Sequence, residues 1–123
     1  MRILIIANND NGLYIFRKML IETLLSKGHE IYISNPEGEY TQAFSEMGCN
    51  CIFTDIDRRG INPMTDIKLI RKYFAIADRV QPDLVITYTI KPNIYGGIVC
   101  RCKKIPYVSN ITGLGTAFQK KDF

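Results

Sequence analysis

The sequence lacks the long apolar segments that membrane-spanning proteins and secreted precursors carry. Its first apolar run covers residues 3–7 and stops at Asn8, far short of the roughly 20 residues of a membrane span. We therefore expect a cytoplasmic protein. Internal repeats and low-complexity tracts are also missing, which excludes a repeat array or a disordered linker. The 123 residues are enough for one domain with a single core.

Patterns typical of metal sites are missing as well. The four cysteines form two C-x-C pairs, Cys49 with Cys51 and Cys100 with Cys102, whereas zinc sites usually carry C-x-x-C. The only histidine, His29, is distant from them in sequence. We expect no bound metal, and we interpret the cysteines as reduced thiols, some of them small core residues.

The chain has neither the G-x-G-x-x-G pattern of dinucleotide-binding domains nor the P-loop pattern G-x-x-x-x-G-K-[ST]. A nucleophile beside a general base is not visible, and we expect no cofactor. The formal net charge of +4 suits an anionic ligand or an anionic membrane surface. It is weak evidence for nucleic acid, and we expect no nucleic-acid partner.

Apolar runs alternate with helical patterns along the whole chain. The runs predict strands at residues 3–7, 30–34, 51–54, 84–87 and 106–109. Helices are predicted at residues 14–27, 39–47, 63–80 and 94–103, the first with an apolar stripe of residues 16, 19, 20 and 24 and the third with one of residues 67, 70, 74 and 77. This alternation predicts an α/β fold: a single Rossmann-like parallel sheet of about five strands with helices on both faces, over residues 1–123.

Four loops that follow strands carry unusual polar chemistry: residues 8–13, 55–61, 87–93 and 110–116. Because parallel strands end at the same edge, these loops should meet there, where open α/β sheets bind ligands. The connections at the opposite edge, including His29, look structural. The sequence therefore predicts a binding site at the carboxyl edge of the sheet.

In the first loop, Asn11 and Gly12 could let backbone N–H groups approach an anion. The alternative is a helix cap formed by Asn11 or Asp10. In the second loop, Arg58 and Arg59 offer planar donor groups that suit phosphate oxygens. Their alternative is an ordinary surface ion pair with a neighbouring aspartate.

The third loop belongs to the segment TYTIKPNIYGG at residues 87–97. If the strand continues, Thr87 and Thr89 face the same side. We expect Lys91 to be a mobile cation at the mouth of the crevice and Asn93 to cap the following helix. The two glycines at the end of the segment allow close packing or close ligand approach.

The last loop has Thr112, Gly113 and Gly115, which could wrap a sugar or a phosphate through backbone groups. Its alternative is a flexible terminal segment.

Four segments together resemble the N-terminal half of family-four glycosyltransferases, in the branch that makes bacterial capsular and related exopolysaccharides. They are residues 9–17 (NDNGLYIFR), 58–63 (RRGINP), 82–97 (PDLVITYTIKPNIYGG) and 105–117 (IPYVSNITGLGTA). They span nearly the whole chain and fall on the four polar loops.

The resemblance implies a GT-B architecture, in which two Rossmann-like domains face each other over a cleft. The N-terminal domain would bind the acceptor, and a C-terminal domain carrying a Glu-x7-Glu motif would bind the nucleotide-sugar. The reaction would retain the anomeric configuration without a metal. Acceptors in this branch are usually undecaprenyl-diphosphate sugars, or an oligosaccharide, at the inner face of the membrane, which implies peripheral membrane association.

The donor domain has no counterpart in these 123 residues. We therefore expect a truncated acceptor-binding part that is inactive alone, because positioning both substrates supplies much of catalysis. Exposed apolar surface would favour homo-oligomers. The alternative is a stand-alone binding module that docks with a separate donor-domain chain.

Overall fold

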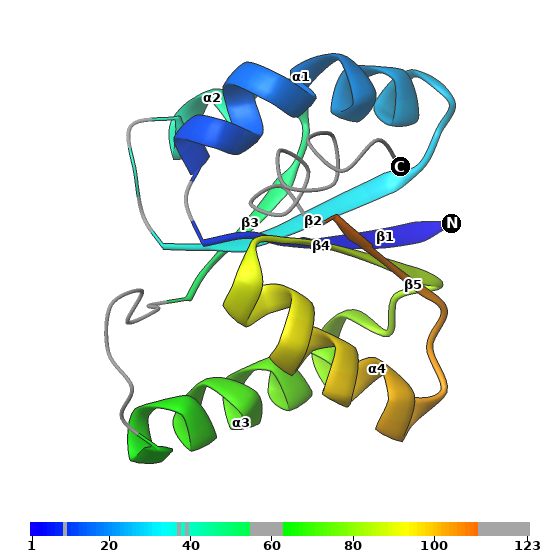
Figure 1. Ribbon diagram of the computed structural model, residues 1–123. Helices are drawn as coiled ribbons and strands as arrows, with labels where there is room; N and C mark the ends of the chain where they lie inside the picture. The colour runs from blue at the N-terminus through cyan, green and yellow to red at the C-terminus, as the bar shows by residue number, and fades with distance from the viewer. Residues whose placement is uncertain (9, 37, 39, 55–62, 111–123) are drawn as a thin grey trace, which may run out of the picture.

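The computed structural model describes residues 1–8, 10–36, 38, 40–54 and 63–110 (Figure 1). The elements follow in the order β1 (Arg2–Ile6), α1 (Asp10–Ser26), β2 (Glu30–Asn35), α2 (Thr41–Met47), β3 (Asn50–Phe53), α3 (Pro63–Val80), β4 (Leu84–Tyr88), the π-helical turn η1 (Pro92–Gly96), α4 (Gly97–Lys103) and β5 (Tyr107–Asn110). Strands and helices alternate, as the sequence pattern predicts.

The five strands form one sheet in the order β3-β2-β1-β4-β5, and every neighbouring pair is parallel. Helices α1 and α2 cover one face, while α3 and α4 cover the other (Figure 1). The predicted Rossmann-like α/β fold is confirmed. Its physical basis is that the central strands β1 and β4 are buried on both faces, so that helices must cover the sheet twice.

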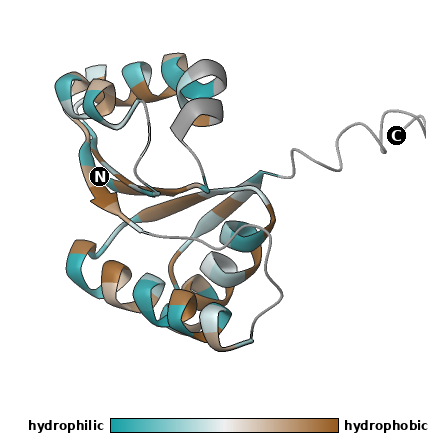
Figure 2. Ribbon diagram, turned by 90° about the vertical axis from the view of Figure 1, so that its left-hand side faces the viewer, coloured by the Kyte–Doolittle hydropathy of each residue, from teal (hydrophilic) through white to brown (hydrophobic). Residues whose placement is uncertain are grey.

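Alternation along the strands divides the core between the two faces. Ile3, Ile5 and Ile33 pack against α1 and α2, whereas Leu4 and Val85 pack against α3 and α4. All five side chains are at most 2 % exposed. Figure 2 shows the hydrophobic strands enclosed between two helical layers whose ribbons mix hydrophobic and hydrophilic residues.

The apolar stripes predicted for the two long helices are confirmed in part: Ala77 is buried, and Leu24, Ile70 and Phe74 pack against the core. In α1 the buried positions include Leu13 and Ile21, whereas Met19 is 81 % exposed and Leu20 is 41 % exposed. In α3 the buried positions include Leu69, Tyr73, Ile76, Ala77 and Val80, whereas Ile67 is 52 % exposed. Because both helices also carry exposed apolar residues, spacing alone could not identify every residue that meets the sheet.

Helix α1 begins at Asp10, four residues before the predicted start at Tyr14. Asn11 and Gly12 therefore belong to its first turn, not to a loop, which corrects the expected position of both residues. The predicted glycine stops are confirmed at Gly48, the C-cap of α2 with φ +107°, and at Gly28, which follows α1 with φ +88°.

The segment after β4 also differs from the expectation. The chain is helical from Ile90 onward, and Asn93 lies inside η1 and does not cap a later helix. Pro92 is tolerated because it falls in the first turn, where a backbone N–H would have no helical partner. Thr89 has φ +72° and β4 ends at Tyr88, so the condition under which Thr87 and Thr89 would share a face is not met.

Candidate functional site

The carboxyl edge of the sheet has a topological switch point between β1 and β4. From β1 the chain crosses toward β2, whereas from β4 it crosses toward β5, so the two connections leave in opposite directions. Such divergence opens a crevice between the strand ends, where sheets of this kind bind ligands. Helix α1 and the helical segment from Ile90 both start at this edge, and their N-termini contribute partial positive charge.

Thr87 and Asn93 hold η1 and β5 against the end of β4. The Thr87 hydroxyl donates to Asn93 Oδ1 at 2.7 Å, and its oxygen lies 3.1 Å from Ser109 Oγ. Asn93 Nδ2 donates to the Asn110 carbonyl at 2.8 Å, and Asn110 Nδ2 reaches the Thr87 carbonyl at 3.3 Å. Because Thr87 is 0 % exposed, these bonds make it a residue that positions the edge.

Gly96 allows this segment to lie directly on the strands. A Cβ atom at Gly96 would stand 3.0 Å from Thr87 Cγ2 and 3.3 Å from Ile6 Cδ1. A Cβ at Gly97 would meet the Tyr107 ring at 3.4 Å, an ordinary contact. Of the two readings of this glycine pair, the structure therefore supports close packing between helix and sheet.

Thr89 stands in a left-handed conformation at the point where β4 ends. A β-branched residue with φ +72° is strained, and such strain is concentrated at functional sites and switch regions. Its hydroxyl donates to the Tyr88 carbonyl, a local bond that offsets part of the strain. The turn sends the chain straight into the helix that starts at Ile90.

Lys91 is not the mobile cation that the sequence predicts. Its Nζ lies 3.1 Å from Asp66 Oδ1 in the first turn of α3, and both side chains are only 17 % exposed. The Tyr95 hydroxyl donates to Asp66 Oδ2 at 2.8 Å. The bonds from Tyr95 and Lys91 lower the pKa of the Asp66 carboxyl. The trio is therefore an ordered charged cluster that joins α3 to η1.

Arg17 is a candidate site residue that the sequence reasoning missed. It follows Leu13 and precedes Ile21 at four-residue spacing, so a cation stands on the core-facing side of α1. Its guanidinium carbon lies 5.6 Å from the ring centre of Tyr88, the last residue of β4. Burial raises the pKa of the Tyr88 hydroxyl, and Arg17 opposes that rise. A charged residue on a buried stripe is the signal that could have identified it.

The β2 half of the edge contains the buried side chains of Ser34, Asn35 and Thr54. Ser34 and Thr54 are buried and join their hydroxyl oxygens at 2.7 Å. Asn35 is 2 % exposed, and its Nδ2 has no hydrogen-bond partner among the residues that the structure describes. A buried N–H donor without a hydrogen bond costs about 1–3 kcal/mol of folding free energy. Asn35 therefore lowers the stability of the fold at this edge.

Part of the predicted site lies outside the described residues. Arg58, Arg59, Thr112, Gly113 and Gly115 belong to this part, and their positions stay predictions. For Asn11 and Gly12 the structure describes only the helical backbone. The structure thus brings Thr87, Thr89, Lys91 and Asn93 to one edge and leaves the other predicted contacts untested.

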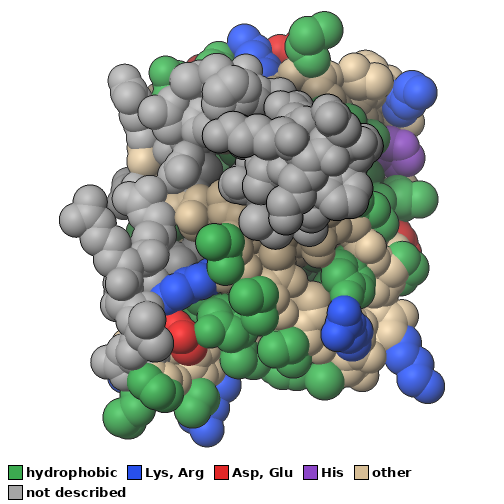
Figure 3. Space-filling model, in the orientation of Figure 1, with side chains coloured by type: hydrophobic (Ala, Val, Ile, Leu, Met, Phe, Trp, Pro, Cys, Tyr) green, Lys and Arg blue, Asp and Glu red, His purple; other side chains and the backbone are tan. Residues whose placement is uncertain are grey.

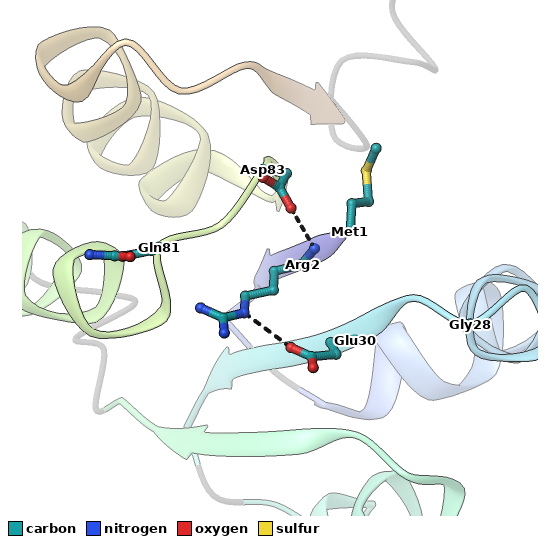
Figure 4. Close-up of a pocket in the computed structure, with 6 residues that line it drawn as sticks. All are labelled: Met1, Arg2, Gly28, Glu30, Gln81 and Asp83. Atoms are coloured by element: carbon teal, nitrogen blue, oxygen red, sulfur yellow. Dashed lines mark hydrogen bonds and ion pairs between the residues drawn. The ribbon is translucent and has the colours of Figure 1, made fainter.

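The opposite edge of the sheet has a depression of about 350 Å³ lined by Met1, Arg2, Gly28, Glu30, Gln81 and Asp83 (Figure 4). Arg2 Nε lies 3.1 Å from Glu30 Oε2, and the Arg2 amide donates to Asp83 Oδ2 at 2.8 Å. The Met1 amine lies 3.2 Å from His29 Nδ1, which agrees with a structural role for that histidine. These exposed groups pair with one another, as in an ordinary surface.

Within the described ranges, no group of three or more histidine, cysteine, aspartate or glutamate side chains could hold a metal ion. The four cysteines are free thiols, and burial raises the pKa of Cys49 to about 12 and that of Cys100 to about 11. The prediction that some cysteines are core residues is confirmed by these two. Among the helices that the structure describes, none is long and apolar enough to cross a membrane.

Comparison with solved structures supports the fold. A glycosyltransferase of Rickettsia africae matches with a TM-score of 0.74 and 14 % identity, over 98 % of this chain and 32 % of that protein. A deacetylase of teicoplanin biosynthesis matches with a TM-score of 0.72 and 10 % identity, over 87 % of this chain and 62 % of that one. Because the same sheet serves two chemistries, this likeness shows the fold alone.

Sequence comparison identifies the family. The chain is 26 % identical over 124 residues to the N,N'-diacetylbacillosaminyl-diphospho-undecaprenol alpha-1,3-N-acetylgalactosaminyltransferase of Campylobacter jejuni. This match covers 100 % of the chain and 33 % of that relative, so the chain spans about a third of its length. The model of the family described as "Glycosyl transferase 4-like" matches residues 2–123. A match over nearly every residue shows that the chain belongs to the glycosyl transferase 4-like family.

Proposed function

We propose that this chain forms the acceptor-binding part of a retaining glycosyltransferase. The acceptor would be a lipid-linked diphosphate-sugar or an oligosaccharide, bound at the carboxyl edge of the sheet. A nucleotide-sugar would be bound by a further domain or a partner chain, and this chain alone would be inactive. The family match over residues 2–123 carries the proposal. The name of the Campylobacter relative, which acts on a diphospho-undecaprenol acceptor, supports the choice of acceptor.

The geometry of the edge fits an anionic, sugar-bearing ligand. Two helices begin beside the switch point, and their N-terminal N–H groups favour an anion. Arg17 adds positive charge from α1, whereas the Lys91 ammonium, in the segment after β4, shares its charge with the Asp66 carboxylate. We assign the diphosphate to Arg58 and Arg59 with Lys91, and the sugar to Thr89 and the loop containing Thr112.

Calorimetric titration of the chain with two soluble ligands tests the proposal. One ligand is a short-chain prenyl diphosphate carrying one sugar, and the other is a UDP-sugar. We expect weak binding of the first and little binding of the second, because the donor site would lie elsewhere. Tight binding of the UDP-sugar with no binding of the prenyl diphosphate sugar would contradict the proposal that this chain binds the acceptor.

A matched pair of charge reversals tests the arginines. Arg58→Glu with Arg59→Glu should weaken binding of the soluble diphosphate about tenfold or more, since each guanidinium makes charge-assisted bonds to phosphate oxygens. Arg71→Glu with Lys72→Glu changes the net charge equally on an exposed part of α3 and should have little effect. Equal losses of affinity in the two variants would mean that Arg58 and Arg59 act only through the net charge of the chain.

A further inference from the structure

The edge strand β3 lacks the features that usually keep such a strand from pairing further. It lies at one end of the sheet, and among the described strands it pairs only with β2. Residues 50–53 (NCIF) contain neither a charged residue nor a proline, which proteins use to protect sheet edges. Thr54 N–H donates to the Asn35 carbonyl at 2.9 Å, so by alternation the main-chain N–H and C=O of Phe53 point away from β2. A further strand can therefore bond to β3 at Phe53.

A groove of about 470 Å³ runs along this edge between the ends of two helices. Residues 50–52 of β3 line it, together with Ser45 of α2 and with Arg79 and Val80 in the last turn of α3. We call it the β3 groove. It lies on the outer side of the sheet and has room for an aromatic side chain from a neighbouring strand.

Phe53 is the exposed apolar side chain of the same strand. It is 65 % exposed, although aromatic residues are the usual anchors of buried interfaces. Cys51 packs with the core cluster beneath α1 and α2, so Phe53, two residues further along the strand, faces that same side. One strand thus carries both a groove and an aromatic residue without a place in the core.

We propose that two copies of this chain pair through β3, antiparallel, about a two-fold axis perpendicular to the sheet. A pair centred on Ile52 places Phe53 of each copy opposite Cys51 of the other, on the α2 side and beside the β3 groove. Each copy then contributes its groove once and its phenylalanine once, as a closed two-fold interface requires. The two five-stranded sheets would join into one continuous sheet.

The neutrality of β3 favours a second copy as the occupant, because like strands can meet without repulsion between charges. An unrelated peptide in the groove would leave Phe53 exposed, whereas a second copy covers the groove and Phe53 together. At β5, the other end of the sheet, Pro106 precedes the strand and Arg101 donates to the Tyr107 hydroxyl. A proline and a cation beside a strand are typical of a protected edge.

The molecule has a second group of exposed apolar residues. Figure 3 shows hydrophobic side chains gathered over η1, α4 and the start of α3, and Ile90 and Ile94 of that segment are 73 % and 52 % exposed. This group lies on helices, whose main-chain groups bond within the helix, so it cannot extend the sheet. It is the natural competitor for a second copy, and the experiment below includes it.

Pairing through β3 leaves the carboxyl edge accessible. Because the strands of the two copies run in opposite directions, their carboxyl edges would point away from each other. The proposal therefore goes beyond the proposed function and does not depend on it. The diphosphate titration and the measurement of dimer mass can fail separately.

Sedimentation velocity of the 123-residue chain over a range of concentrations tests the dimer. The wild-type chain should reach twice its mass of 14.1 kDa. One short strand pair with two phenylalanines is a small interface, so we expect a dissociation constant of about 1–100 μM. Phe53→Asp should raise this constant at least about tenfold, because pairing would bury a carboxylate. Met19→Asp, at an 81 % exposed position on α1, is the matched control and should dimerise like wild type.

Cysteine crosslinking tests the register. Ile52 would lie directly opposite Ile52 of the second copy, as a pair without main-chain hydrogen bonds, and the Cα atoms of such pairs are about 4.5 Å apart. This separation permits a disulfide. Ile52→Cys, in a chain that also carries Cys51→Ser and Cys102→Ser, should form a covalent dimer under mild oxidation. Met19→Cys in the same background should not.

Three outcomes would overturn the proposal. The first is a wild-type chain that stays monomeric up to about 100 μM. The second is a dimer that Phe53→Asp leaves intact, above all one that Ile90→Ser/Ile94→Ser dissociates, which would assign the interface to the helical group. The third is a dimer in which Ile52→Cys crosslinks no better than Met19→Cys, which would exclude the antiparallel strand pair. Thermal unfolding of Phe53→Asp like that of wild type would show that its loss of pairing is not a loss of fold.

Discussion

The two edges of the sheet differ in how their polar groups are buried: those at the amino edge are exposed, and several at the carboxyl edge are buried. At the amino edge, the exposed carboxylates of Glu30 and Asp83 both bond to Arg2, one to its guanidinium and the other to its backbone N–H. At the carboxyl edge, Thr87 is fully buried within a chain of neutral hydrogen bonds, and the Nδ2 of buried Asn35 has no partner within the described part of the chain. Exposed pairs contribute little, whereas buried polar groups are costly if they lose a partner. The edge that carries the family resemblance is thus the one where substitution should be least tolerated.

The largest effect is expected at Gly96. Gly96→Val should lower the free energy of unfolding by about 2–3 kcal/mol, because its side chain would enter the space filled by Thr87 and Ile6. Urea unfolding measures this. The matched pair Gly96→Ala and Gly97→Ala tests the packing directly. Gly97→Ala adds a methyl at ordinary contact distance and should be tolerated, whereas Gly96→Ala should lower the free energy of unfolding. Equal costs for both alanines would show that packing does not distinguish the two glycines.

Asn93→Ala should cost about 1–3 kcal/mol, because it leaves the Asn110 carbonyl without its donor and removes the acceptor of the Thr87 hydroxyl. Asn93→Asp keeps an acceptor for Thr87 and loses only the donor, so its cost should be smaller. Thermal unfolding of both variants measures the order. A neutral Asn93→Ala would mean that water replaces the network without loss.

Asp66→Asn should destabilise the protein at neutral pH in a pH-dependent way. The bonds from Tyr95 and Lys91 hold the folded pKa of Asp66 below its ordinary value of 3.8. The stabilisation that they provide is therefore complete above that value and is lost as the pH falls through the folded pKa. The difference in unfolding free energy between wild type and variant should shrink as the pH falls below about 4, as urea titrations at several pH values can show. A constant difference would exclude the carboxylate as its source.

The smallest effect is expected at the amino edge. Glu30→Gln removes an ion pair with Arg2 in which the side chains are 58 % and 48 % exposed. Its cost should stay within about 1 kcal/mol and should fall further in added salt, because exposed pairs are screened. Urea unfolding at low and high salt checks this. A loss as large as that of Asn93→Ala would remove the contrast between the two edges.

The fold could be predicted from sequence because its signals are local. Runs such as residues 3–7 are apolar and β-branched, and Gly28 and Gly48 end their helices in the left-handed region. The helix starts were less accurate. Asn8 to Gly12 read as a loop because every residue there favours turns, yet α1 begins at Asp10. Local propensity gave way to the packing of α1 on the sheet.

The sequence could predict where the candidate site lies, but it could not predict which interactions its residues make. Strand order brings the loops to one edge, and this follows from topology. The ion pair of Lys91 with Asp66 joins residues 25 positions apart, and the contact of Arg17 with Tyr88 crosses from helix to strand. Such pairings depend on how α1 and α3 lie on the sheet. The spacing of residues in the sequence does not determine these helix positions.

The π-helical turn at Pro92–Gly96 sets how far the residues before it are rotated about the helix axis relative to α4. Each residue of an α-helix turns the chain by about 100°, so removing one residue from this wide turn would rotate everything before it by roughly that angle relative to α4. Ile90 and Lys91 would then leave the outer surface and Asp66, even with every side chain unchanged. The length of this short segment is therefore under tighter constraint than the chemistry of most residues within it.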